Sequence, residues 1–276
     1  MHLIIQGSDV ATADLKHLAR LCGASGIGQV SPNVFRLVDA SPAAGIAELC
    51  AQARLDHAFV PADRRLADIR LLVMDMDSTL ITIETIDELA DMNGVKREVA
   101  TITAQAMRGE IEYDESLRRR LALLKGLDQS ALKRVYDERL QLSPGAERLL
   151  AQAKSHGIKT LLVSGGFTCV TDRLKTRLSL DSTYANTLEI ADGRLTGKIV
   201  GRTVNAEAKR DELMRMRDAM GIGREQIVGV GDGANDLKFL AECGVSVAYR
   251  AKPIVREQTT HAINHVGLDG VMNLFN

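Results

Sequence analysis

The sequence predicts an α/β fold: a parallel-sheet core domain with an inserted helical cap, plus a small N-terminal α+β domain. Three observations predict it. From residue 69 onward, short apolar runs alternate with longer helical patterns, as in a parallel sheet with crossover helices. Residues 84–157 are helical by pattern almost throughout, which exceeds what one crossover needs. Residues 1–68 instead carry small alternating elements of both kinds.

The N-terminal 68 residues are predicted to form a βαββαβ domain. Strands are expected at 3–7, within 27–40 on either side of a turn at 31–33, and at 57–61, and helices at 11–24 and 41–55. Ser41 is placed to cap the second helix, with Pro42 in its first turn. The order is that of ferredoxin-like domains, and by element order it resembles the amino-acid-binding ACT domains.

The second domain, 69–276, is predicted to be built on a Rossmann-like sheet. Its candidate strands are 69–74, 159–164, 226–231 and 245–249. Each of the first three ends in a cluster of polar residues. Because ligands of an open parallel sheet bind outside the carboxyl ends of its strands, those three ends could form one site.

The segment between the first two core strands is predicted to be the cap. We place the cap at about 84–143, with the core at 69–83 and 158–276. Asn93-Gly94 and Gly126 mark helix ends, and Asp128 is a predicted cap. Ser143 precedes Pro144 at the start of a further helix. Later, Asp192-Gly193 between alternating residues predicts a hairpin.

The amino-acid composition limits the classes of partner that the protein can bind. A formal net charge of −1 and 3% aromatic residues argue against nucleic acid as a partner. No apolar run approaches the roughly 20 residues that span a membrane, and the N-terminus does not resemble a signal peptide. The four cysteines are scattered and without zinc spacing: Cys22, Cys50, Cys169 and Cys243. We therefore expect a cytoplasmic protein with a small-molecule substrate; a homodimer is left open.

Two acidic residues follow the first core strand. Asp75 and Asp77 are two positions apart in the segment MDMDSTL, so in an extended chain both carboxylates face the same side. They could be ordinary strand-end turn residues. However, like charges this close repel, and they call for a cation, a proton or both. A functional role accounts for that cost better than a role in folding.

A second acidic cluster follows the third core strand. In the segment GDGAND, Asp232, Asn235 and Asp236 stand at the entry to a helix after a glycine-rich strand end. Any one of them could be a helix cap. Together they offer the hard oxygen ligands that suit Mg²⁺, which binds few carboxylates and keeps its waters and the substrate phosphate.

The second core strand ends in the segment VSGGF. Ser164 supplies a hydroxyl, and Gly165 and Gly166 expose backbone amides before a helix, which is a favourable anion site. By itself, however, this segment is better explained as a plain turn. Lys209 opens a later helix, and a lone helical lysine is normally a solvated surface charge.

These four segments together resemble a known family. DMDST at 75–79, SGG at 164–166, Lys209 and GDGAND at 231–236 resemble, in order and spacing, the motifs of the haloacid-dehalogenase-like hydrolase superfamily. The segments ETIDELA, ITAQAM, ESLRRRLALLKGL, GAERLL, VSGGF, DGRLTG and VGDGANDL are similar to its phosphoserine phosphatase family, across about residues 70–275. The N-terminal 68 residues lie outside the resemblance.

The resemblance implies an Mg²⁺-dependent phosphatase that hydrolyses O-phospho-L-serine to L-serine, the last step of serine biosynthesis. Asp75 would be the nucleophile that forms an aspartyl-phosphate, and Asp77 the general acid and base. A neighbouring carboxylate raises the pKa of one member of such a pair, whereas Mg²⁺ and Lys209 lower it. The sequence leaves open which effect prevails.

The resemblance also implies the remaining ligands. Metal ligands would be Asp75, Asp77 through its backbone carbonyl, Asp232 and Asp236. Substrate-binding residues would be Glu84, Met107, Tyr113, Arg120, Ser164, Gly165, Lys209 and Asn235. Within this set, the guanidinium of Arg120 would bind the substrate carboxylate, and Glu84 would accept a hydrogen bond from the ammonium group of the substrate.

Two rival interpretations stay open at this point. The chain could hydrolyse another small phosphomonoester, or transfer the phosphoryl group to an acceptor other than water, with Glu84 and Arg120 used differently. It could also be an amino-acid-sensing regulatory protein with a vestigial phosphatase site. The intact motifs argue against the second rival.

Overall fold

The computed structural model describes residues 1–276. They group into two compact units, the first made of Met1–Leu72, Ser143–Lys159 and Ile222–Asn276, and the second of Val73–Leu142 and Thr160–Gly221. Two strands, β5 (Leu71–Met74) and β6 (Lys159–Phe167), have residues in both units. None of the helices combines the length and apolar composition that crossing a membrane requires.

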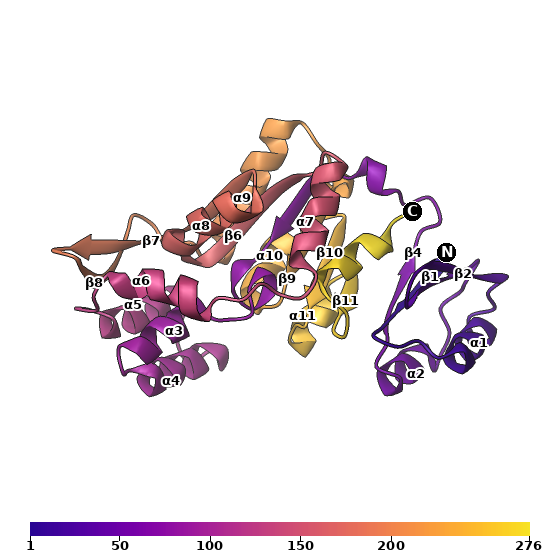
Figure 1. The fold of residues 1–276 in the computed structure, drawn as a ribbon, viewed down its shortest axis with the longest axis horizontal. Coiled ribbons are helices and arrows are strands. Elements are labelled where there is room, and N and C mark those ends of the chain that lie inside the picture. Colours follow the sequence, from indigo (N-terminus) through magenta and orange to yellow (C-terminus); the bar gives the residue numbers. More distant parts are fainter. The chain divides into compact units, whose positions relative to one another are not determined.

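The N-terminal part of the first unit is a four-stranded antiparallel sheet covered by two helices. Its strand order is β2 (Gly26–Ser31), β3 (Val34–Val38), β1 (His2–Gln6) and β4 (Asp56–Val60). Helices α1 (Thr12–Leu21) and α2 (Ile46–Gln52) lie on one face, as the indigo part of Figure 1 shows. Their buried residues join Leu3 and Ile5 in one apolar core. The separate α+β domain in the predicted fold class is therefore confirmed.

Two predicted helix starts are wrong in the same way. Neither Ser41-Pro42 nor Ser143-Pro144 begins a helix: α2 begins at Ile46 and α7 (Ala146–Ser155) at Ala146. In both cases the residue before the helix is a glycine with left-handed backbone, with φ of 86° at Gly45 and 79° at Gly145. Only glycine adopts this conformation without strain. The chain therefore turns once more before the helix starts.

The C-terminal part of the first unit continues with parallel strands. β9 (Ile227–Gly231) pairs with β10 (Val245–Tyr249), and β10 pairs with β11 (His261–Ile263). The short helix η4 (Arg224–Gln226) precedes β9. The strands are connected by η5 (Ala234–Asp236) and α10 (Leu237–Leu240), and then by α11 (Pro253–Gln258). Two more are η1 (Leu66–Asp68) before β5 and η6 (Leu268–Leu274) near the C-terminus. β5 is hydrogen-bonded to β9 on one side and to β6 on the other.

The second unit combines a strand hairpin with most of the helices. β6 pairs in parallel with β7 (Ser182–Ala191), which forms an antiparallel hairpin with β8 (Arg194–Val200). The hairpin turn is the predicted Asp192-Gly193, and both residues have positive φ. The helical elements are η2 (Met76–Leu80), α3 (Thr85–Met92), α4 (Lys96–Met107), α5 (Tyr113–Leu123), α6 (Ser130–Arg134), η3 (Val135–Arg139), α8 (Thr168–Leu178) and α9 (Ala206–Met220).

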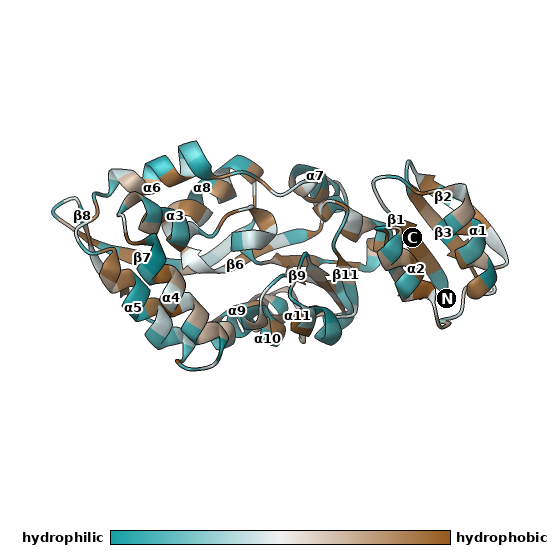
Figure 2. Ribbon diagram, turned by 90° about the horizontal axis from the view of Figure 1, so that it is seen from below, coloured by the Kyte–Doolittle hydropathy of each residue, from teal (hydrophilic) through white to brown (hydrophobic).

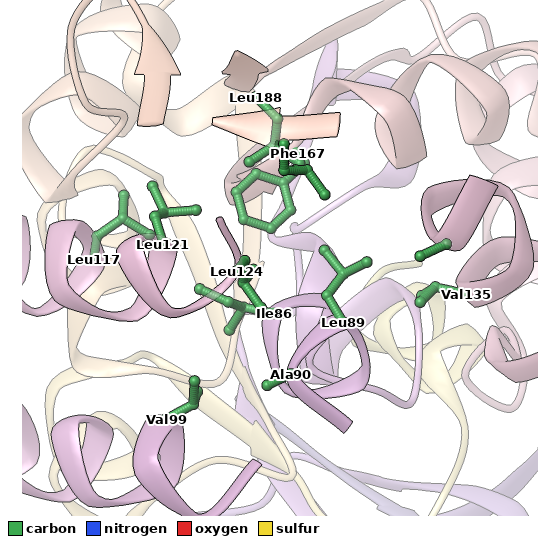
Figure 3. Close-up of a cluster of buried hydrophobic side chains, with 12 residues drawn as sticks. Ile86, Leu89, Ala90, Val99, Leu117, Leu121, Leu124, Val135, Phe167 and Leu188 are labelled. Atoms are coloured by element: carbon green, nitrogen blue, oxygen red, sulfur yellow. The ribbon is translucent and has the colours of Figure 1, made fainter. Parts of the chain in front are cut away.

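The helices of the second unit enclose an apolar core of their own. In Figure 2 the helices show both teal and brown segments, as amphipathic helices do. Figure 3 shows the buried ring of Phe167 beside Leu188 and close to Leu89 of α3. Phe167 directly follows the segment SGG, and α3 begins directly after Glu84. This core therefore fixes two of the predicted site segments against each other.

Candidate active site

Asp75 stands where β5 ends and the chain turns. Its carboxylate Oδ1 accepts a hydrogen bond from the backbone N–H of Met76 at 2.7 Å, and the residue is only 5% exposed. Three residues later, Ser78 has a φ of 55°, a left-handed conformation that is uncommon for a residue with a side chain. The backbone strain at Ser78 belongs to the same turn that points Asp75 and Asp77 to their partners.

The buried carboxylate of Asp75 is paired with Lys209. The Lys209 Nζ lies 2.9 Å from Asp75 Oδ1, and the lysine side chain is only 1% exposed. Asn205 caps α9 by accepting from the N–H of Ala208 at 3.1 Å, and this places Lys209 in the first turn of the helix. A fully buried lysine needs a counter-charge, so Lys209 is not the surface charge that a lone helical lysine normally is.

Asp77 is held by Thr85 rather than by a cation. Its Oδ1 accepts from the Thr85 hydroxyl at 2.6 Å and from the Thr85 backbone N–H at 3.2 Å. Burial, followed by the negative charge of Glu84, raises the pKa of Asp77 to about 7, although the Thr85 bonds and Lys209 act in the opposite direction. A carboxyl with a pKa near neutrality can both give and take a proton at pH 7.

The segment after the second core strand packs tightly against Asp77. The Ser164 hydroxyl is buried and accepts from the N–H of Gly166 at 2.9 Å. A Cβ added to Gly166 would lie 2.7 Å from Asp77 Oδ2, so only glycine fits there. The carbonyl of Gly165 accepts from Asn186 Nδ2 at 2.8 Å, which anchors the segment to β7.

The cap residues predicted to bind substrate are placed as follows. Tyr113 stands at the start of α5 with its hydroxyl against Gly165, and burial raises its pKa. Glu84 is exposed and accepts from the Ser78 hydroxyl at 2.6 Å. Arg120 is partly buried in α5, and its Nε donates to the carbonyl of Ser116 at 3.4 Å. Met107 ends α4 and is 62% exposed.

In the first unit, the segment after β9 forms a tight turn around Asp236. This carboxylate is fully buried, and its Oδ2 accepts from the N–H groups of Asp232 at 3.1 Å and Gly233 at 3.0 Å. Asp232 and Asn235 are partly exposed beside it, and Asn235 Nδ2 lies 3.5 Å from Asp236 Oδ1. Two carboxylates and one amide are thus concentrated at one strand end.

Three residues that support this site were not predicted from the sequence. Thr85 holds Asp77, and Ser78 holds Glu84. Asn186 bridges two segments, since it donates to Gly165 and its Oδ1 accepts from the N–H of Val204 at 2.8 Å. Thr85 has a detectable signal, because a threonine at a helix start directly after Glu84 often bonds a nearby polar group. Asn186 lies within a strand and carries no such signal.

The second unit therefore holds an ion-paired carboxylate and a carboxyl group of raised pKa in one turn. The carboxylate of Asp75 is paired with a buried ammonium, while the pKa of Asp77 is raised to about 7. A buried anionic nucleophile and a carboxyl with a raised pKa are the two groups that covalent hydrolysis of a phosphate ester requires.

Residues 72–241 match the family described as haloacid dehalogenase-like hydrolase. The chain belongs to this family. The predicted resemblance is thereby confirmed, together with the fold class, since this hydrolase has the parallel-sheet core of the family. Residues 3–46 match a family described only as a domain of unknown function.

Several similar proteins are phosphoserine phosphatases. The hydrolase is 52% identical over 217 residues to the phosphoserine phosphatase of Polaromonas sp., covering 77% of this chain and 92% of the relative. The unliganded structure of a probable phosphoserine phosphatase from Vibrio cholerae superposes with a TM-score of 0.86 at 35% identity, covering 99% of this chain and 85% of the other. A substrate-bound phosphoserine phosphatase complex superposes with a TM-score of 0.71 at 36% identity, covering 75% and 99%.

Proposed function

We propose that this hydrolase is a phosphoserine phosphatase, which converts O-phospho-L-serine and water to L-serine and phosphate as the last step of serine biosynthesis. The observation that carries the proposal is the buried Asp75–Lys209 ion pair beside Asp77, whose pKa is about 7. The phosphoserine phosphatases to which the chain is similar support the choice of substrate.

Asp75 is the proposed nucleophile. Its carboxylate oxygen attacks phosphorus, a P–O bond to Asp75 forms, and the bond between phosphorus and the seryl oxygen breaks. Protonated Asp77 gives its proton to the departing seryl oxygen. Asp77, now ionised, takes a proton from the water that attacks the aspartyl-phosphate, and this releases phosphate and restores both carboxyl groups.

Mg²⁺ is the proposed cofactor. The proposed ligands are the carboxylates of Asp75, Asp232 and Asp236 and the backbone carbonyl of Asp77. Hard oxygen donors of this kind fit Mg²⁺ rather than a softer metal. When bound, the ion would neutralise charge on the phosphoryl oxygens.

The remaining predicted residues would bind the two ends of the substrate. Ser164, the amide of Gly165, Lys209 and Asn235 are proposed to contact the phosphoryl oxygens. At the serine end, Arg120 is proposed to pair with the carboxylate and Glu84 with the ammonium, while Met107 and Tyr113 close over the substrate. The high exposure of Met107 leaves it accessible to a ligand.

Substrate specificity can be tested with Arg120→Gln and a matched control. Arg119 is a neighbour on α5 whose guanidinium is already paired with Glu115, so Arg119→Gln removes one charge without touching the proposed site. We expect Arg120→Gln to lower kcat/KM for phosphoserine by about 100-fold or more, the size of a lost charged contact, while turnover of p-nitrophenyl phosphate changes little. If phosphoserine is not among the best substrates in a panel of phosphomonoesters, the specific name is wrong.

Three further predictions remain proposals. We propose a cytoplasmic location, supported by four free cysteines. We also propose that the chain divides into two domains. The N-terminal domain comprises residues 1–68 and the phosphatase domain residues 69–276, with the cap at about 84–143. A homodimer would be consistent with exposed Ile27 and Val30 on the edge strand β2, and sedimentation velocity would test it.

A further inference from the structure

A cavity lies within the first unit. Its volume is about 900 Å³. One wall comes from the N-terminal domain and includes Ser8, Asp9, Asp14 and Arg54, and the other comes from the β10–β11 region and includes Arg250, Arg256 and His265. The proposed phosphatase chemistry uses none of these residues.

The cavity carries an excess of positive charge. Three guanidinium groups, those of Arg54, Arg250 and Arg256, face two carboxylates, those of Asp9 and Asp14. None of the three arginines forms an ion pair, whereas many other arginines of the chain do, for example Arg65 with Asp68. The guanidinium of Arg250 lies over the face of the Tyr249 ring, at 5.3 Å from its centroid. Three guanidinium groups are therefore available to an anionic ligand.

Two of these arginines sit on strained backbone. Arg54 has a φ of 55° and Arg250 a φ of 47°, in the left-handed region where glycine is favoured. Glycine would remove the unfavourable φ at both positions; at Arg54 this φ belongs to the end of α2, since the residue directly follows the C-cap Ala53. Unfavourable backbone of this kind is concentrated at ligand-binding positions.

The wall of the cavity is rigid and connects the two parts of the first unit. Asp56 of β4 is buried, and its carboxylate accepts three backbone N–H groups, from Asn264 at 2.7 Å, His265 at 2.9 Å and Val266 at 3.0 Å. The N–H of Arg250 donates to the carbonyl of Ile263 at 2.7 Å. Both cavity walls are thus held by hydrogen bonds before any ligand arrives.

The cavity is also connected to the segment after β9. The N–H of Lys252, between Arg250 and Arg256, donates to the carbonyl of Asp232 at 3.5 Å. A ligand that moved the backbone between Arg250 and Arg256 would also move Lys252. That bond ends on one of the proposed metal ligands.

We propose that this cavity is a regulatory site for a small anion with at least two negative charges, bound by Arg54, Arg250 and Arg256, whose occupancy alters turnover through Lys252 and Asp232. Phosphoryl and carboxylate groups share the chemistry that guanidinium forks recognise. The binding half of the proposal is independent of the proposed function, and only the turnover half depends on it.

Calorimetry on the full chain tests binding. Succinate and inorganic phosphate are titrated into wild type, into the double variant Arg54→Gly/Arg250→Gly and into Arg20→Gln, an exposed arginine outside the cavity. We expect the Kd of at least one probe to rise tenfold or more in the double variant only. The glycines relieve strain, so its Tm in the absence of ligand should equal or exceed that of wild type.

The two probes identify the ligand class. If succinate binds to wild type but not to the double variant, the ligands of the site are carboxylates. If only the binding of phosphate is lost in the double variant, the ligands are phosphoryl compounds. If neither probe binds to wild type, or if both bind equally to the double variant, the site is overturned. Phosphate bound by the proposed active site does not confuse the result, because that site is unchanged in the double variant.

Kinetics test the connection to Asp232. With saturating probe, the change in kcat/KM for phosphoserine in wild type and in Arg20→Gln should differ at least twofold from the change in the double variant, which measures any product inhibition by phosphate at the proposed active site. An unchanged kcat/KM in wild type under conditions where calorimetry shows occupancy would overturn the regulatory role. A chain that binds the probe but does not hydrolyse phosphoserine would contradict the proposed function instead.

Discussion

Two strand ends of this molecule carry acidic clusters, and they differ in what satisfies the acids. After β5, Asp75 is paired with a buried ammonium, and Asp77 keeps a pKa of about 7. After β9, the carboxylate of Asp236 is bound by the N–H groups of its own turn. The first cluster depends on side chains distant in the sequence, whereas the second is largely made by local backbone.

The difference suggests that the cluster after β5 takes part in the reaction, whereas the cluster after β9 holds its groups in position. A carboxylate bound by backbone amides is fixed in place, as a metal ligand should be. A carboxyl group whose pKa is raised because its ionised form is unfavourable, as at Asp77, can exchange a proton near neutral pH. The comparison predicts that variants after β5 change reactivity most and that variants after β9 change stability as well.

The largest effect is expected at the proposed nucleophile. Asp75→Asn keeps the shape of the side chain but removes the anionic oxygen, so kcat should fall by about 10⁴-fold or more. Phosphate release from phosphoserine measures it, with the exposed Asp63→Asn as a control. Retained activity in a pure preparation would exclude Asp75 as the nucleophile.

Lys209→Met should have the next largest effect. It leaves the carboxylate of Asp75 buried without its counter-charge, and breaking such a pair costs about 3–5 kcal/mol of unfolding free energy. Urea unfolding at pH 7 measures the loss. Lys198→Met, on the exposed face of β8, should change it by less than about 0.5 kcal/mol. Equal effects of the two variants would mean that the Asp75–Lys209 pair does not stabilise the fold.

Asp236→Ala tests the local cluster. It leaves two backbone N–H groups without an acceptor, so the unfolding free energy should fall by about 1–3 kcal/mol. Asp236→Asn retains one oxygen that can accept both bonds and should lose less stability. The ranking of the two variants is measured by urea unfolding without metal, and the reverse ranking would contradict the role assigned to the turn.

A change in the pH dependence of stability is expected at Asp77. Its folded pKa of about 7 exceeds the ordinary 3.8, so the folded state holds a proton that the unfolded state has lost. Stability should therefore fall as pH rises from about 4 to 7, and no further above that range. In metal-free protein, Asp77→Asn should remove this part of the slope.

Thr85→Val sharpens the same test. The Thr85 hydroxyl bonds the ionised carboxylate and lowers the pKa of Asp77, so its loss should raise that pKa and extend the falling part of the stability curve to higher pH. Valine keeps the volume of the side chain. A downward shift would show that Thr85 stabilises the protonated form instead.

Local sequence signals predicted most of the elements. Periodicity located the strands and helices, and Asp192-Gly193 gave the hairpin turn, because these depend on neighbouring residues. The same reasoning failed at Ser41 and Ser143, where a left-handed glycine prevented the expected cap from starting a helix. A cap signal is weak when the backbone conformation of the next residues is set elsewhere.

By itself, the sequence determined which groups could do the chemistry: two aspartates after an apolar strand, a glycine-rich anion segment and an acidic cluster. Tertiary structure alone decided their states. It buried Lys209 against Asp75, gave Asp77 the partner Thr85 and anchored Gly165 through Asn186. Burial and charge pairing depend on residues far apart in the chain, and these two factors set the pKa values on which reactivity rests.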